Sequence, residues 1–229
     1  MKKNIAASGI ALMAIGAVCA SVLAATQPPA SANLILTWSA DNFYPSDYEG
    51  KALPANGSSV SVSLETVKSG KLQDLKSVPI AWYLDGDWLS GGVGQKHASF
   101  VVTKAKGASH SLRAVAGLPE GEAEQTVSVP IVAREIVIET PYRSGFTASA
   151  AKPIVFRAVP YFFNITSITD LLFSWTAGGD TRSASGDNEL SVNLGGAQNQ
   201  TTLPVSVAVR GVSSVFESAS DAVIITINP

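Results

Sequence analysis

Apolar and polar residues alternate in short runs along most of this chain. Every second residue is apolar in 60–64 (Val-Ser-Val-Ser-Leu) and again in 205–209 (Val-Ser-Val-Ala-Val). A period of two is typical of half-buried β-strands, whose successive side chains point to opposite faces of a sheet. Apart from the N-terminal segment, no stretch shows apolar residues at helical spacing over three turns, so we expect almost no helix. The pattern predicts an all-β protein.

The expected strands are separated by turn residues. The segment 41–57 carries Pro45, Gly50, Pro54 and Gly57 and is expected to be a long loop. Strands are expected around 34–38, 60–64, 78–84, 98–102, 112–116, 127–131, 136–138, 154–158, 173–175, 190–194, 205–209 and 223–227.

One stretch occurs twice, as PIAWYLDGD at 79–87 and as LLFSWTAGGD at 171–180. In both, alternate apolar residues lead to a tryptophan, Trp82 or Trp175, and a Gly-Asp turn follows. We expect each tryptophan to be buried on the central strand of a β-sandwich, with a hairpin behind it. The two halves match with a shift of 93 or 94 residues, as from Trp82 to Trp175 and from Val60 to Ile154. The sequence therefore predicts two tandem immunoglobulin-like β-sandwich domains, residues 33–133 and 134–229, with no linker of any length between them.

Each half, with six or seven short strands and a tryptophan on the third, resembles the bacterial immunoglobulin-like and PKD-like domains of exported surface proteins. The segment 44–54 (YPSDYEGKALP) resembles one found in uncharacterised exported proteins of small-genome bacteria. The resemblance covers nearly the whole mature chain and rests on Trp82, Trp175 and this segment. Neither half has the cysteine pair that flanks the tryptophan in antibody domains. The resemblance implies an architecture of stalks, spacers or adhesive modules, and no reaction.

The first 25 residues have the pattern of an export signal. Lys2 and Lys3 are followed by an uncharged, small and apolar run, and 22–24 (Val-Leu-Ala) offers small residues for cleavage. The run is just long enough to span a bilayer, so an uncleaved membrane anchor is the alternative. Residues 26–32 form a Pro-containing spacer. We expect an exported protein that is extracellular, at the cell surface or periplasmic.

Composition and charge narrow the function further. Hydrophobic residues make up 46% of the 229 residues and charged residues 15%, which is enough apolar material for real cores. The formal charge is −2, and no basic cluster remains once the signal is removed, so nucleic-acid binding is not expected. The single cysteine, Cys19, lies inside the signal segment. The mature domains must therefore be stabilised by their cores without disulfides.

Conventional catalytic groups are sparse. Two histidines are present, His97 and His110, both at strand entries and neither in a hydrolase or zinc-protease motif. We interpret both as solvated turn residues and expect no enzymatic activity, no cofactor and no zinc site.

Calcium would need oxygen ligands alone. Asp85 and Asp87 flank Gly86, and Asp180 and Asp187 bracket the matching loop of the second half. Since Asp-Gly is common in hairpin turns, we favour the turn interpretation and leave weak calcium binding open.

Aromatic residues in and near loops are the best candidates for partner binding. Phe43, Tyr44 and Tyr48 lie in the long loop 41–57, and Trp88 follows the Asp-Gly turn. Further rings, Tyr142, Phe146, Tyr161, Phe162 and Phe163, lie in or near loops of the second half. Such rings stack on sugars or contact proteins, but they also close the ends of sandwiches and the joint between domains. We expect Tyr48 to fold inward as a cap above Trp82, and Phe43 and Tyr44 to be exposed.

The function predicted from the sequence is a non-catalytic structural spacer or protein-interaction module of the cell envelope. A carbohydrate-binding module that uses the loop aromatics is the alternative. The partner would be an envelope protein or a glycan, with membrane contact only through an uncleaved N-terminal segment. A spacer should show polar faces and a stiff joint, whereas a glycan binder should carry exposed rings on one sheet or loop cluster.

Overall fold

The computed structural model describes residues 33–140, 147–149, 153–195, 199–214 and 216–228. The predicted signal and spacer (1–32), with Cys19, and the loop residues Tyr142 and Phe146 lie outside the described residues. The regular structure is almost entirely strand, as the alternation predicts, with one short 3-10 turn, η1 (Ile168–Asp170). Across the described ranges, no helix has the length and hydropathy needed to cross a membrane.

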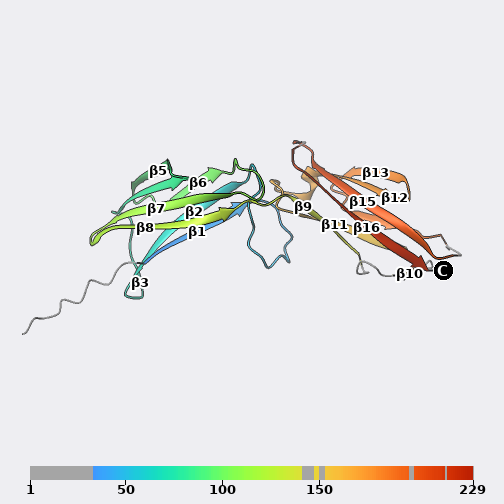
Figure 1. The fold of residues 1–229 in the computed structure, drawn as a ribbon, viewed down its shortest axis with the longest axis horizontal. Coiled ribbons are helices and arrows are strands. Elements are labelled where there is room, and N and C mark those ends of the chain that lie inside the picture. The colour runs from blue at the N-terminus through green and yellow to red at the C-terminus, as the bar shows by residue number, and fades with distance from the viewer. Residues whose placement is uncertain (1–32, 141–146, 150–152, 196–198, 215, 229) are drawn as a thin grey trace, which may run out of the picture. The chain divides into compact units, whose positions relative to one another are not determined.

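The first sandwich consists of two antiparallel sheets (Figure 1). One sheet has β2 at its centre, paired with β1, β3 and β6, and the other has the order β5-β4-β7-β8. The strands are β1 (Asn33–Asp41), β2 (Ser59–Lys68), β3 (Lys71–Leu72), β4 (Pro79–Leu84), β5 (Asp87–Val93), β6 (His97–Val101), β7 (Ser109–Leu118) and β8 (Gly121–Pro130).

Alternation along these strands sends one set of side chains into a common core. Val60, Val62 and Leu64 of β2 face Trp82 of β4 and the alternate apolar residues of β7. Trp82 is fully buried, and its indole N–H donates a 2.9 Å hydrogen bond to the carbonyl oxygen of Gln95. The buried tryptophan expected from the sequence is confirmed.

The second sandwich repeats this plan (Figure 1). One sheet has the order β14-β11-β9, and the other has the order β10-β16-β15-β12-β13, in which β10 runs parallel to β16. The strands are β9 (Glu135–Glu139), β10 (Thr147–Ser149), β11 (Ile154–Tyr161), β12 (Leu171–Ala177), β13 (Asp180–Ser185), β14 (Glu189–Val192), β15 (Thr201–Gly211) and β16 (Ser218–Asn228).

Trp175 takes the place that Trp82 has in the first sandwich. It is buried on β12 among Phe156, Phe173 and Val207, and its indole N–H donates to the carbonyl oxygen of Asp187 at 3.4 Å. In both sandwiches the tryptophan strand lies inside its sheet, between its hairpin partner and the next long strand. This strand order is immunoglobulin-like, so the predicted fold class of two tandem β-sandwiches is confirmed.

Alternation did not predict the strands β5 and β13. Both are edge strands that follow the Gly-Asp turns, and their sequences, DWLSGGV and DTRSAS, are largely polar or small. An edge strand needs one neighbour and little apolar surface, so its pattern is weak. The Gly-Asp turns before β5 and β13 were the signal in the sequence for these strands, and both turn glycines, Gly86 and Gly179, have positive φ.

The described residues belong to one compact unit by the contacts between their Cα atoms. Within it the buried residues form two clusters, the first ending at Ile131 and the second beginning at Ile136. The short segment between these two residues therefore carries the chain from one core to the other.

Candidate functional site

Two side-chain contacts hold the long loop 41–57 of the first sandwich in a folded conformation. The Asn42 side chain donates a 2.7 Å hydrogen bond to the Leu53 carbonyl, and the Lys51 ammonium lies 3.4 Å from the centroid of the Trp38 ring on β1. Burial lowers the pKa of Lys51. The loop is therefore folded back on its own sandwich and is not a free arm.

The same loop also pairs with the second sandwich through its backbone. The Phe43 N–H donates to the Phe163 carbonyl at 2.7 Å, and the Phe162 N–H donates to the Phe43 carbonyl at 2.7 Å. Phe162 adopts a φ of 63°, a left-handed conformation that is uncommon for a bulky residue. Phe43 is half-buried by this pairing, so the expectation that it is exposed is wrong.

Tyr48 lies at the centre of a group of rings, Tyr44, Tyr48, Tyr161 and Phe162, which we call the joint aromatic cluster. Its ring contacts Tyr161 and Phe162 edge-on, with centroid distances of 5.7 and 5.8 Å. The ring also occupies the space that a side chain at Gly50 would need. Tyr48 folds inward, but the expectation that it caps the first sandwich above Trp82 is wrong, because its ring packs on Tyr161 and Phe162 of the second sandwich. Burial, followed by the charge of Glu139, raises the pKa of Tyr161.

Polar residues make a second connection, the joint polar cluster of Asn56, Ser58, Arg134, Asn164 and Glu217. Arg134 lies in the short segment between the two cores. Two of its guanidinium nitrogens donate to Glu217, and the distance from Nε to Oε2 is 2.5 Å. Its Nη2 also donates to the carbonyl oxygen of Asn56 at 2.5 Å. Arg134 thereby joins a loop of the second sandwich to a loop of the first.

Asn164 completes the joint polar cluster. Its Nδ2 donates to the Asn56 carbonyl (3.0 Å) and to Glu217 (2.9 Å), and its Oδ1 accepts from the Ser58 hydroxyl at 2.6 Å. Gly57 has a φ of 86°, and a Cβ there would lie 3.1 Å from the Asn164 amide nitrogen. A glycine is needed at this point for the two loops to approach so closely.

The joint polar cluster is suited to a structural role. Side-chain exposure is 14% for Arg134 and 11% for Glu217, and the Glu217 carboxylate accepts from Arg134 and from both the backbone and the side chain of Asn164. A buried, bidentate Arg–Glu pair fixes geometry, and it holds no free nucleophile or base.

No local pattern in the sequence pointed to Arg134, Asn164 or Glu217. The available signal was weak: Arg134 is a charged residue in a segment too short to be a linker, between strands of successive domains. Glu217 is an isolated acidic residue in the segment 212–217 (VSSVFE) between two expected strands. Their pairing spans 83 positions and became visible only in the fold.

A cavity of about 330 Å³ lies beside the joint. Phe43, Tyr44 and Pro45 form one wall of this cavity, and Val159 and Pro160 form another. Tyr44 is 44% exposed, as expected for this residue.

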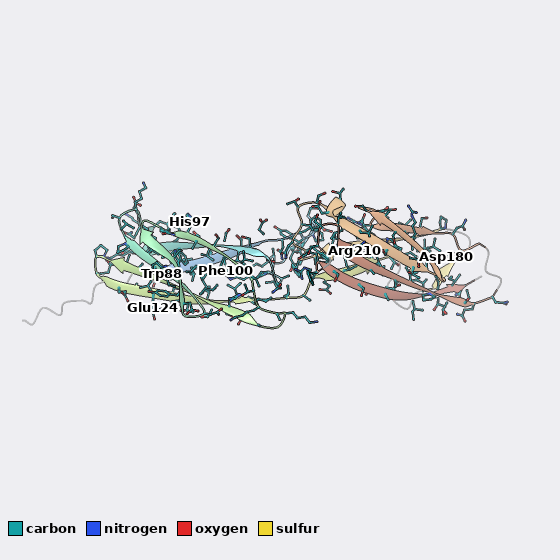
Figure 2. The ribbon with its side chains drawn as sticks, turned by 90° about the horizontal axis from the view of Figure 1, so that it is seen from above. Trp88, His97, Phe100, Glu124, Asp180 and Arg210 are labelled. Atoms are coloured by element: carbon teal, nitrogen blue, oxygen red, sulfur yellow. The ribbon has the colours of Figure 1, made fainter. Side chains whose placement is uncertain are left out.

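Trp88, the fourth residue predicted to bind a partner, is not part of this group. Figure 2 labels Trp88 on the first sandwich, where it belongs to β5. Its side chain is 61% exposed. The structure thus brings Phe43, Tyr44 and Tyr48 together at the joint and places Trp88 on an outer sheet face.

The interpretation of His110 as a solvated turn residue is wrong. His110 is 2% exposed, lies edge-on to Phe100, and its Nδ1 is 2.6 Å from Asp85 Oδ2. His110 is the second residue of β7, where the alternation of the strand points it inward. His97 is exposed at the start of β6, as expected (Figure 2).

Asp85, a candidate calcium ligand, already has partners within the protein. Its carboxylate accepts hydrogen bonds from the Lys104 ammonium at 2.7 Å and from the Ser111 N–H at 3.0 Å, in addition to its contact with His110. Burial alone raises its pKa, but hydrogen bonds from Lys104, Ser111 and His110 lower the pKa of Asp85 to about 2. Asp187, in the second half, pairs with Arg182 at 2.7 Å. Across the described ranges, no three His, Cys, Asp or Glu side chains gather as a metal site.

Comparison with known proteins gives likenesses of fold. No protein-family model matches the chain, and no curated protein matches its sequence. Among solved structures, it is similar to the three N-terminal domains of the highly immunogenic outer capsid protein of bacteriophage RB49, with 12% identity and a TM-score of 0.46. That likeness covers 86% of this chain and 59% of the phage protein, so this chain spans less than two thirds of it.

Two further solved structures are similar over most of their length. The fibronectin(III)-like modules of CbhA from Clostridium thermocellum share 17% identity, with 84% of this chain and 94% of theirs covered and a TM-score of 0.31. The titin domains Z1Z2, solved in complex with telethonin, share 14% identity, with 86% and 97% covered and a TM-score of 0.28. The solved structures that this chain resembles are thus tandem immunoglobulin-like and fibronectin-III-like domains.

Proposed function

We propose that this protein is a non-catalytic module of the cell envelope, exported by its N-terminal segment, in which two immunoglobulin-like sandwiches act as one stiff spacer. It holds a contact surface at a fixed distance and orientation from its point of attachment. The partner is an envelope protein or a glycan, and the wider family is that of bacterial exported surface proteins.

The observation that carries this proposal is the joint polar cluster. Domains joined by a flexible linker usually share few specific contacts, so motion between them is the default expectation. Here Arg134 and Asn164, both bound to Glu217 of the second sandwich, donate to the Asn56 carbonyl of the first, and Phe43 pairs with Phe163 through the backbone. Opening the joint would leave these mostly buried donors and acceptors without partners, which opposes the motion.

Polar sheet faces give further support. The outward positions of β8 are Glu122, Glu124, Thr126 and Ser128, and β13 carries Asp180, Arg182 and Ser183. Such faces suit solvent, and they leave recognition to particular surfaces and loops.

Distance measurement between two spin labels tests the stiff joint. Ser128 on β8 and Ser191 on β14 are exposed serines in different sandwiches, and a cysteine at each position can be labelled once Cys19 is replaced by alanine. We expect a single narrow distance distribution for the purified protein. Glu217→Ala should broaden the distribution, because Arg134 and Asn164 lose their shared acceptor.

The matched control is Glu189→Ala, a change of the same kind at an exposed position on β14 outside the joint. It should leave the distribution narrow. A broad distribution in the unchanged joint would contradict the spacer function, and so would equal widths for Glu217→Ala and the unchanged protein.

A further inference from the structure

An outer face of the first sandwich carries a row of side chains in register across four strands. Trp88 of β5 lies opposite Tyr83 of β4, Tyr83 lies opposite Arg113 of β7, and Arg113 lies opposite Thr126 of β8. In the next row Gly91, Ala81, Val115 and Glu124 face outward. We call Trp88, Tyr83, Gly91, Arg113 and Glu124 the Trp88 face.

A β-bulge puts Trp88 in this row. The register of β5 against β4 shifts between Trp82 and Tyr83, so that Leu89 turns to the core while Trp88 stands opposite Tyr83 on the outside. Bulges commonly re-aim a side chain in this way. Without the shift, Leu89 would take the outward position beside Tyr83.

Gly91 gives the indole room to lie across the sheet. A Cβ at Gly91 would come within 2.4 Å of Cη2 of Trp88 and 3.1 Å of its Cζ2. The six-membered ring of Trp88 therefore occupies the space that a side chain at 91 would fill. Tyr83 meets the indole edge-on, with a centroid distance of 5.8 Å and an interplanar angle of 85°.

Polar groups of defined geometry flank the rings. The Arg113 guanidinium lies over the Tyr83 ring, 4.2 Å from its centroid, and donates a 3.0 Å hydrogen bond to Glu124. Arg113 is thus held in place by a ring below and a carboxylate beside it. Figure 2 labels Trp88 and Glu124 on the first sandwich.

This arrangement has the complementarity that a pyranose ring requires. A hexopyranose presents C–H bonds on one face, which pack on the negative face of an indole, and hydroxyl groups at its rim. A guanidinium donates to two neighbouring hydroxyls, and a carboxylate accepts from them. The indole is 61% exposed, so a sugar can reach it without any rearrangement.

The charge of the Trp88 face and the extent of its apolar surface indicate which class of ligand fits it. The outer strands of this sheet carry the carboxylates Asp87, Glu122 and Glu124, and this acidic character disfavours acidic sugars. The outward neighbours of the indole are Tyr83, Gly91 and Ala81, with Val115 and the exposed Val93 farther out on the same sheet face. A protein interface would need a wider apolar centre around its anchor.

We propose that the Trp88 face is a binding site for a neutral hexopyranose unit of a glycan. Trp88 stacks on the sugar ring, and Arg113 and Glu124 bind its hydroxyl groups. The site uses a sheet face of one sandwich, so it does not depend on the stiffness of the joint.

Calorimetric and fluorescence titration of the purified protein tests the site. The probes are the β-1,4-linked hexamers of glucose and of N-acetylglucosamine, an α-mannose hexamer, and a galacturonic acid hexamer as the acidic sugar. We expect at least one neutral hexamer to bind and to change the tryptophan fluorescence. Trp88→Ala should weaken this binding about tenfold or more, and Arg113→Met and Glu124→Gln should each weaken it severalfold.

Phe216→Ala is the matched control, because it removes an exposed ring outside the Trp88 face. It should leave sugar binding unchanged, and thermal melting checks that every variant is folded. The proposal is overturned if no neutral hexamer binds at millimolar concentration, if Trp88→Ala binds as well as the unchanged protein, or if the acidic hexamer is preferred. Self-association that Trp88→Ala abolishes, without sugar binding, would assign the face to a second copy of the chain instead.

Discussion

Arg134 and Glu217 form a two-point ion pair across 83 positions of the chain, and both side chains are mostly buried. Arg134 follows the last strand of the first sandwich, and Glu217 precedes the last strand of the second. The pair is completed by the Asn56 carbonyl and by Asn164. Its main effect is to specify one geometry at the joint, since a buried ion pair adds little net stability over well-packed apolar groups.

Removing one member of this pair should be costly. We expect Arg134→Met to lower the free energy of unfolding by about 3–5 kcal/mol, because Glu217 would remain buried without its guanidinium partner. The double variant Arg134→Met, Glu217→Leu should recover part of that loss. Urea denaturation measures both. A loss below about 0.5 kcal/mol for the single variant would show that the pair is solvated in solution.

The two tryptophans should dominate the stability of their cores. Trp82→Ala and Trp175→Ala should each lower the free energy of unfolding by about 3–5 kcal/mol, because each removes a large buried side chain. Trp88→Ala is the control, since the side chain is exposed and its loss should change stability by about 0.5 kcal/mol or less. Denaturation followed by circular dichroism compares the three. Equal effects at Trp82 and Trp88 would be inconsistent with the core described here.

Substitutions at Tyr48 and Tyr44 should differ in their effect on stability. Tyr48→Ala removes the central ring of the joint aromatic cluster and should cost about 1–3 kcal/mol. Tyr44→Ala removes a ring at the edge of the cluster that is 44% exposed, and it should change the melting temperature less than Tyr48→Ala does. Calorimetric melting of both variants tests the difference. The assignment of Tyr48 to the centre of this cluster fails if its variant melts like the unchanged protein.

Protonation of Asp85 at low pH should lower the stability of the first sandwich. Its folded pKa of about 2 lies below the unfolded value of about 3.9, so its stabilising effect is complete above pH 4. The effect is lost as the pH falls from about 4 through 2, when the carboxylate takes up a proton. Asp85→Asn should therefore be less stable than the unchanged protein at pH 6, and the gap should close towards pH 2. A gap that is independent of pH would show that the carboxylate charge is not involved.

Export predicts a specific N-terminus. Because 22–24 offers small residues for cleavage, the native protein should begin near Ala25 or Thr26 and should lie outside the cytoplasmic membrane. Sequencing the N-terminus of protein from the native cells measures this directly. An intact Met1 on a soluble cytoplasmic form would contradict both the signal and the localisation.

The sequence by itself determined the fold class and most strands. Period-two alternation is a local property, and a strand such as β2 or β7 can be identified from it because one face must be apolar to be buried. The repeated tryptophan stretch likewise predicted buried Trp82 and Trp175. The domain limits 33–133 and 134–229 stay predictions. The edge strands β5 and β13 escaped detection because an edge strand need not present a regular apolar face to the core.

The tertiary structure alone decided which residues meet. Alternation places His110 inward, but the nearby Asp85 that pairs with it comes from another strand end. The joint polar cluster draws on loops of both sandwiches, and no local pattern connects Asn56, Arg134 and Glu217. Trp88 takes its outward position from a shift in strand register. The first two depend on pairing between segments far apart in sequence, and the third on the register of one hairpin within its sheet. Such pairings are fixed by packing and hydrogen bonding of the whole fold, not by the pattern of a single strand.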